Sequence, residues 1–171
     1  YTVMPDRIAA ATYMAAAAVT GGTVLLRDVN SEHLLPVLSA FESTGCAVMQ
    51  SGSELLLRAP QRLKPVRHVR TMPYPGFPTD AQAPVMTMAA GGDGTSIFVE
   101  NIFESRYKHV PELARMGADI KVEGRVALVQ GSSQKGRAAR AAFPVRRSRQ
   151  RICAAARRLL SQALRRRAKH R

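Results

Sequence analysis

Residues 1–131 contain one pattern twice, and this internal duplication constrains the fold more than any other feature of the sequence. Each copy begins with an aspartate just after a proline: Asp6 follows Pro5 directly, and Asp80 follows Pro78 with Thr79 between them. Two glycines lie 23 residues apart in both copies, Gly22 with Gly45 and Gly94 with Gly117. A period of about seventy residues is much longer than a solenoid repeat. The duplication therefore predicts two α/β units that follow each other along the chain.

The hydrophobic spacing predicts the same order of elements in both copies. Apolar residues at helical intervals predict helices over about 6–19, 34–41, 80–90 and 110–116. The apolar residues after each Gly-Thr pair predict a strand, and the segments 47–58 and 119–131 each predict a hairpin. A further strand is expected at 66–72. Gly45 and Gly117 stand where helices end in a left-handed residue, so each unit is expected to read α-β-α-β-β.

Charge divides the chain into two regions. The net charge is +14, but residues 1–131 carry 12 basic and 12 acidic side chains, whereas residues 132–171 carry 14 basic ones and no acid. We therefore expect an α/β domain over 1–131, with repeats at about 1–60 and 66–131, and a separate Arg-rich tail over 132–171.

The tail allows three interpretations. Residues 149–168 could form a basic amphipathic helix, which would make the chain a small protein that binds nucleic acid or an anionic membrane through 132–171. Fourteen positive charges without acids also favour a disordered extension. The third interpretation, a frameshift in a GC-rich gene, fits the abrupt change of composition best, because the tail is rich in Arg, Ala, Ser and Gln.

The remaining sequence features narrow the class of protein. Cys46 and Cys153 lack metal-ligand spacing, and we expect free thiols in a reducing, cytoplasmic compartment. No apolar run is long enough to span a bilayer. The histidines and acids show no metal-binding pattern, and the glycines at 91–94 lack the ending of a phosphate-binding loop.

Three stretches resemble a known family: "MPDRIAAATYMAAAAVTGG", "VRTMPYPGFPTDAQAP" and "IFVENIFESRYKHVPELARMGADI". They are similar to the UDP-N-acetylglucosamine 1-carboxyvinyltransferases over residues 1 to about 131. The resemblance implies two of the three βαβαββ repeats of that family's second domain. It also implies transfer of the enolpyruvyl group of phosphoenolpyruvate to the 3′-hydroxyl of UDP-N-acetylglucosamine in peptidoglycan precursor synthesis, with no metal or organic cofactor. The related enolpyruvylshikimate phosphate synthases share the fold, but "FPTD" and "HVPEL" look less like their segments.

The resemblance also assigns site residues. Taken alone, Thr79 predicts a helix N-cap and Asp80 a first-turn acid, and the prolines before them would hold the carboxylate still. By resemblance, Asp80 is the general base at the 3′-hydroxyl, and Thr79 and Ile102 contact the sugar nucleotide, Ile102 through its main chain. Arg106 would act near the reacting groups, although its residues-only interpretation is a surface ion pair with Glu104 or Glu112.

The sequence departs from the family in ways that put activity in doubt. The family's catalytic cysteine loop, its lysine–asparagine pair and the arginine that binds phosphoenolpyruvate have no counterpart. The basic tail stands where a "DLR" segment is expected. We therefore expect an incomplete and inactive part of the enzyme, whose partner would be the missing first domain. A non-catalytic remnant is a further alternative.

Overall fold

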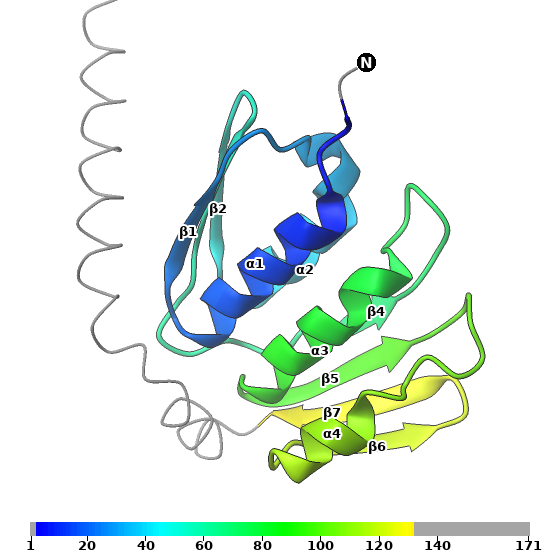
Figure 1. Ribbon diagram of the computed structural model, residues 1–171. Helices are drawn as coiled ribbons and strands as arrows, with labels where there is room; N and C mark the ends of the chain where they lie inside the picture. Colours follow the sequence, from blue (N-terminus) through cyan, green and yellow to red (C-terminus); the bar gives the residue numbers. More distant parts are fainter. Residues whose placement is uncertain (1–2, 132–171) are drawn as a thin grey trace, which may run out of the picture.

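The computed structural model describes residues 3–131 of the 171-residue chain (Figure 1). The predictions for Cys153 and for the tail at 132–171, including its helix and its frameshift origin, lie outside the described residues. Within the described part, two α/β units follow each other, as the duplication predicted. No helix in this part is long and apolar enough to cross a membrane.

The first unit is a three-stranded antiparallel sheet with two helices. Its elements are α1 (Arg7–Val19), β1 (Thr23–Leu26), the 3-10 turn η1 (Ser31–Leu34), α2 (Leu35–Ser43), β2 (Ala47–Ser51) and β3 (Glu54–Arg58). The strand order is β1-β3-β2. In the central strand, buried Leu55 and Leu57 alternate with exposed Glu54 and Arg58. This period of two places one face of the sheet against the helices.

The second unit repeats this arrangement and adds a strand. Its elements are β4 (His68–Arg70), the 3-10 turn η2 (Thr79–Ala81), α3 (Gln82–Ala90), β5 (Gly94–Val99), α4 (Val110–Arg115), β6 (Asp119–Glu123) and β7 (Val126–Gly131). The order is β4-β5-β7-β6, with β4 parallel to β5. Val69 is buried between exposed His68 and Arg70 on this edge strand. The second unit is therefore a complete βαβαββ repeat, and the predicted α/β class is confirmed.

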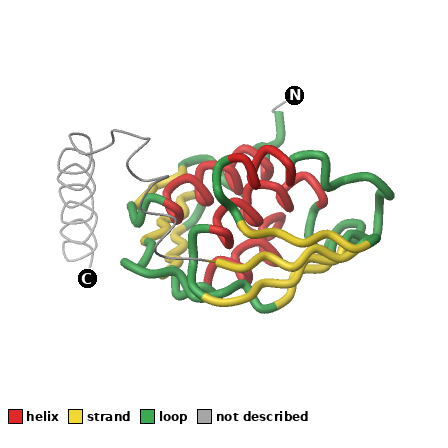
Figure 2. The backbone as a smooth tube through the Cα atoms, turned by 90° about the horizontal axis from the view of Figure 1, so that it is seen from below, coloured by secondary structure: helices red, strands yellow, loops and turns green. Residues whose placement is uncertain are grey.

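The two units share one hydrophobic core. Helices α1 and α3 pack side by side, and the two sheets lie on the outside of the group of helices (Figure 2). The buried face of α1 is made of alanines around Met14, and small side chains let two helices approach closely. Met14 and Met86 are fully buried in one continuous cluster. The two copies therefore form a single packed body.

Both predicted helix ends are confirmed. Gly45 and Gly117 adopt φ of +89° and +92°, a conformation that costs a residue with a Cβ atom about 1–2 kcal/mol. The amides that follow them close the same turn in both copies: Cys46 N donates to Phe41 O (3.3 Å) and Ala118 N to Leu113 O (3.0 Å). The equal spacing of the glycines therefore reflects the same C-terminal turn in both helices.

Candidate functional site

The start of α3 differs from the prediction that Thr79 caps the helix. Pro78 is the N-cap of η2 and makes no side-chain cap hydrogen bond. The Thr79 hydroxyl instead donates to Oε2 of Glu100 at 2.9 Å. A buried carboxylate must have donors, and Thr79 supplies one. The N-cap expectation was therefore wrong, because Pro78 takes the N-cap position and Thr79 lies inside η2.

Asp80 forms an ion pair with Arg106, 26 residues further along the chain. The sequence predicted Glu104 or Glu112 as the surface partner of Arg106, but Glu104 lies 3.7 Å from Arg125 and Glu112 lies 3.0 Å from Arg115. The Asp80 and Arg106 side chains are 58% and 39% exposed. A surface pair of this kind contributes only about 0–1 kcal/mol. Both groups therefore remain open to exchange for a ligand at little cost.

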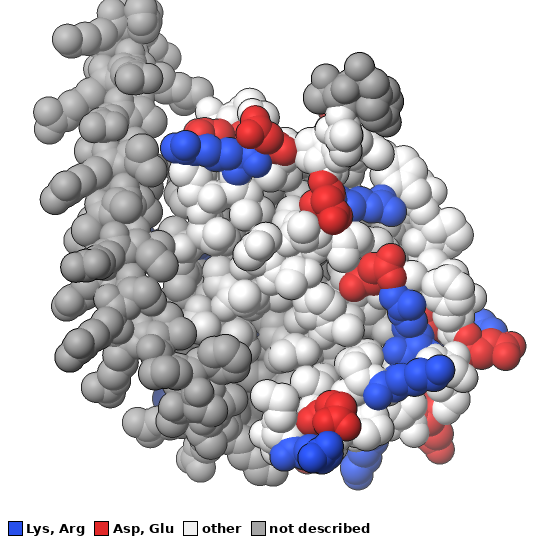
Figure 3. All heavy atoms as spheres, in the orientation of Figure 1, with Lys and Arg blue, Asp and Glu red and all other residues white. Residues whose placement is uncertain are grey.

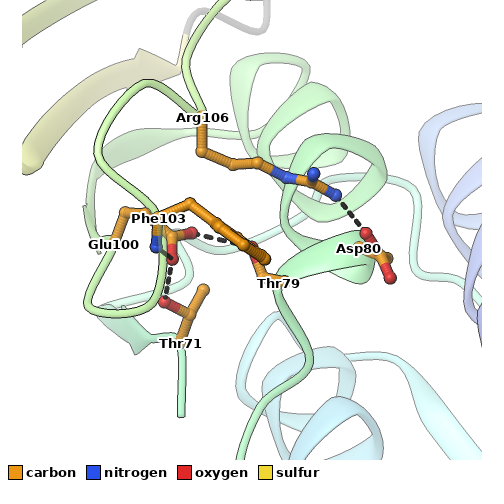
Figure 4. Close-up of polar contacts among 6 residues, drawn as sticks. All are labelled: Thr71, Thr79, Asp80, Glu100, Phe103 and Arg106. Atoms are coloured by element: carbon orange, nitrogen blue, oxygen red, sulfur yellow. Dashed lines mark hydrogen bonds and ion pairs between the residues drawn. The ribbon is translucent and has the colours of Figure 1, made fainter. Parts of the chain in front are cut away.

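Phe103 supports the guanidinium of Arg106. The Cζ atom of Arg106 lies 5.5 Å from the centroid of the Phe103 ring, within the range of a cation–π contact. Figure 4 shows the arginine extending from the 100–109 loop, past the ring, toward Asp80. Phe103 is half exposed. The ring limits the orientations of the guanidinium and keeps its donors directed at the Asp80 side.

Glu100, which the sequence analysis did not select, connects these parts. It is 1% exposed. Its Oε1 accepts from Thr71 Oγ1 (2.8 Å), Ile102 N (2.8 Å) and Phe103 N (3.1 Å), and its Oε2 from Thr79. Burial raises the pKa of this carboxyl, but the hydrogen bonds outweigh burial and hold the pKa below the ordinary value. The available signal was an acid directly after an apolar strand.

The fourth predicted residue, Ile102, lies in the same network. Its N–H is taken by Glu100, so a main-chain contact from Ile102 to a ligand has to use its carbonyl oxygen. The structure therefore brings all four predicted residues to one region: Figure 4 shows Thr79, Asp80 and Arg106 together, and the bond to Glu100 places Ile102 beside them. The roles assigned to them remain predictions.

The proline-rich stretch before Asp80 is tied to the first copy. The Cζ atom of Arg7 lies 5.3 Å from the centroid of the Tyr74 ring, and the rings of His33 and Tyr74 pack in a T shape with their centroids 6.0 Å apart. Met72 N donates to Phe77 O at 3.0 Å, which closes the loop, and Phe77 is buried. The first copy therefore helps to hold the segment that delivers Thr79 and Asp80.

Two further titratable groups lie beneath the site. The Tyr107 hydroxyl is directed at the carbonyl oxygens of Phe98 and Arg125, each at 3.1 Å; burial, together with the charge of Glu100, raises the pKa of Tyr107 to about 12. His109 Nε2 lies 3.4 Å from the sulfur of Met86. Burial, aided by the charge of Arg106, lowers the pKa of His109. Neither group belongs to a candidate metal site, because no three His, Cys, Asp or Glu side chains in residues 3–131 lie close enough together to hold an ion.

Cys46 does not belong to this site. It lies in the first copy, directly after α2, and is 5% exposed. Burial raises the pKa of its thiol, although a contact with Thr44 opposes this, so the thiolate needed for nucleophilic chemistry is disfavoured.

The charged side chains on the face in Figure 3 are acidic and basic ones side by side. This face offers no broad patch of one sign.

Comparisons with known proteins assign the sequence to a family. A sequence model of EPSP synthase (3-phosphoshikimate 1-carboxyvinyltransferase) matches residues 1–144. The chain is 51% identical over 131 residues to UDP-N-acetylglucosamine 1-carboxyvinyltransferase 1 of Symbiobacterium thermophilum, which covers 77% of this chain and 30% of that protein. The protein of the same name from Desulfofundulus thermocisternus is 49% identical over 131 residues, 77% of this chain and 54% of the relative.

Solved structures show the same fold at low sequence identity. The enolpyruvyl transferase NikO from Streptomyces tendae superposes with a TM-score of 0.68 at 21% identity, covering 77% of this chain and 31% of that one. An EPSP synthase from Acinetobacter baumannii gives a TM-score of 0.54 at 17% identity, covering 77% and 32%. The chain thus spans about a third of most of these proteins and about half of one curated relative.

Proposed function

This chain belongs to the EPSP synthase family, and from that premise we propose that it carries part of the active site of a UDP-N-acetylglucosamine 1-carboxyvinyltransferase. Relatives that are 45–51% identical to it over 131 residues bear that name. The substrates would be UDP-N-acetylglucosamine and phosphoenolpyruvate. The proposal places the reaction in peptidoglycan precursor synthesis in the cytoplasm, where the buried thiol of Cys46 would stay reduced.

The observation that carries this proposal is the pairing of Asp80 with Arg106 at an exposed position. A general base must lie within hydrogen-bond reach of the hydroxyl that it deprotonates, and an exposed carboxylate at the start of α3 is available for this. An arginine fork suits a phosphate or a carboxylate. When an anionic substrate takes Arg106, the Asp80 carboxylate loses its partner and becomes free to accept a proton.

The proposed reaction is addition followed by elimination. The 3′-oxygen of the sugar attacks C2 of phosphoenolpyruvate while its proton passes to Asp80, and the methylene carbon gains a proton from an acid that this proposal assigns to another domain. Loss of that carbon's proton and of phosphate then restores the double bond. Thr79 would contact the sugar nucleotide through its backbone or as an acceptor through its hydroxyl oxygen, since Glu100 takes the hydroxyl hydrogen, and Ile102 through its carbonyl oxygen.

Ligand-observed NMR on the full chain tests the proposal with two acids at matched places. We expect UDP-N-acetylglucosamine to bind, Asp80→Ala to abolish the signal, and Asp6→Ala, the equivalent change in the first copy, to keep it. Shikimate 3-phosphate serves as the competing ligand, because the matching family model is named for that chemistry. Binding of shikimate 3-phosphate alone, or equal loss of UDP-N-acetylglucosamine binding in both variants, would contradict the proposal.

A further inference from the structure

We propose that Glu100 is the positioning residue of this site, a buried carboxylate that fixes Asp80 and Arg106 relative to each other without touching substrate. This inference deepens the proposed function and rests on it for the identity of the ligand. Three segments meet at the carboxylate: the residue after β4 (Thr71), the start of η2 (Thr79) and the loop after β5 (Ile102 and Phe103).

The contacts reach each member of the ion pair through one neighbour. Thr79 precedes Asp80 directly, so the bond to Oε2 fixes the backbone that carries the proposed base. On the other side, Oε1 fixes the amide of Phe103, whose ring supports the guanidinium of Arg106. Figure 4 shows Thr79 and Phe103 beside the Glu100 carboxylate. A shift of Glu100 therefore displaces both the base and the cation.

An ionised carboxylate suits this position because every partner is a donor. A carboxylate has about four acceptor sites and no hydrogen to present, and four donors reach it here, three at Oε1 and one at Oε2. Thr71 extends the network, since its Oγ1 also accepts from Asn101 N at 2.9 Å. The loop that bears Ile102 and Phe103 thus has three successive amides fixed by one buried charge and its hydroxyl partner.

The first copy shows that the fold of the unit does not need such an acid. Asp28 follows Gly22 by the same six positions by which Glu100 follows Gly94. Asp28 is exposed, with φ of 56°, while its strand β1 pairs with β3 just as β5 pairs with β7. Folding of the repeat therefore does not explain why Glu100 is buried, whereas positioning of the site does.

Glu100→Gln in the full chain is the central test. The amide oxygen can still accept the three donors at Oε1, and the amide nitrogen can donate to the Thr79 hydroxyl, so the variant retains the hydrogen-bond count but loses the charge. Asp28→Asn is the matched control. Thr79→Val removes only the Oε2 contact, and Thr79→Ser restores it. The readouts are the Arg106 side-chain ¹⁵N–¹H signal without ligand, amide exchange at Ile102 and Phe103, and the Kd for UDP-N-acetylglucosamine.

We expect Glu100→Gln and Thr79→Val to shift the Arg106 signal, Glu100→Gln to speed amide exchange at Ile102 and Phe103, and both to weaken binding at least about tenfold, since hydrogen bonds to charged groups are strong. Asp28→Asn should match the parent chain, and Thr79→Ser should restore the Arg106 signal that Thr79→Val shifts. An unchanged Arg106 signal in both variants, or the same shift in Asp28→Asn, would overturn the positioning role. If the parent binds no UDP-N-acetylglucosamine, the proposed function fails, and the ligand-free Arg106 signal still decides the role of Glu100.

Discussion

The two copies of the repeat carry acids at the same two places and use them in opposite ways. In the first copy, Asp6 caps α1 by accepting from Ile8 N (2.7 Å) and Ala9 N (3.2 Å), and Asp28 is exposed. In the second copy, Asp80 caps nothing and pairs with Arg106, and Glu100 is buried. The same sequence pattern therefore serves helix formation in one copy and leaves an exposed carboxylate paired with Arg106 in the other.

A second difference lies in how the copies divide the chain between loop and helix. Helix α2 has 9 residues and α4 has 6, although the flanking glycines are equally spaced. The proline at each helix start moves accordingly, from 14 residues after Gly22 (Pro36) to 17 residues after Gly94 (Pro111). In the second copy, the loop before the helix is therefore three residues longer and the helix three residues shorter. The longer loop carries Phe103 and Arg106.

The largest effect is expected at the matched strand positions Phe98 and Leu26. Phe98 is fully buried, whereas Leu26 is only half-buried. We expect Phe98→Ala to lower the free energy of unfolding by about 3–5 kcal/mol and Leu26→Ala to lower it by about half as much or less, because less apolar surface returns to water. Urea unfolding followed by circular dichroism measures both. Equal losses would show that the two copies are packed alike.

A smaller effect is expected at the two aspartates that follow proline. Asp6→Ala removes a true N-cap and should cost about 1 kcal/mol of stability. Asp80→Ala removes only a surface ion pair, which should change the free energy of unfolding by no more than about 0.5 kcal/mol. The same urea titration compares them. A larger loss in Asp80→Ala than in Asp6→Ala would reverse the assignment of cap and functional acid.

The sequence was sufficient for the parts of the structure that depend on local pattern. The helices, hairpins and left-handed glycines follow from spacing, because each is decided within one turn or one strand pair. Thr79 and Arg106 show where such reasoning fails. Both have plausible local partners, but the chosen ones lie 21 and 26 residues away. Glu100 was missed for the same reason, since its burial depends on three segments that meet only in the fold.

The smallest effect on stability is expected from lowering the pH, which protonates a histidine at the start of one helix. His109 and Leu34 are the N-cap residues of α4 and α2, and only the first can titrate. Because the pKa of His109 is lowered in the folded chain, the unfolded chain takes up the proton first as the pH falls, and stability is lost below the ordinary histidine pKa. The urea midpoint should decline as the pH falls from about 7.5 to about 5.5, and His109→Leu, which introduces the residue of the first repeat, should make that decline smaller. An unchanged decline would assign it to other groups.

The packing of α1 along α3 has a consequence for the connection between the copies. Each helix would expose its apolar face if its own copy were produced alone, so neither half should be able to fold independently. The peptide link itself contributes little, because Gln61 and Arg62 at the junction are exposed. A chain cut between them should therefore reassemble from its two pieces by fragment complementation.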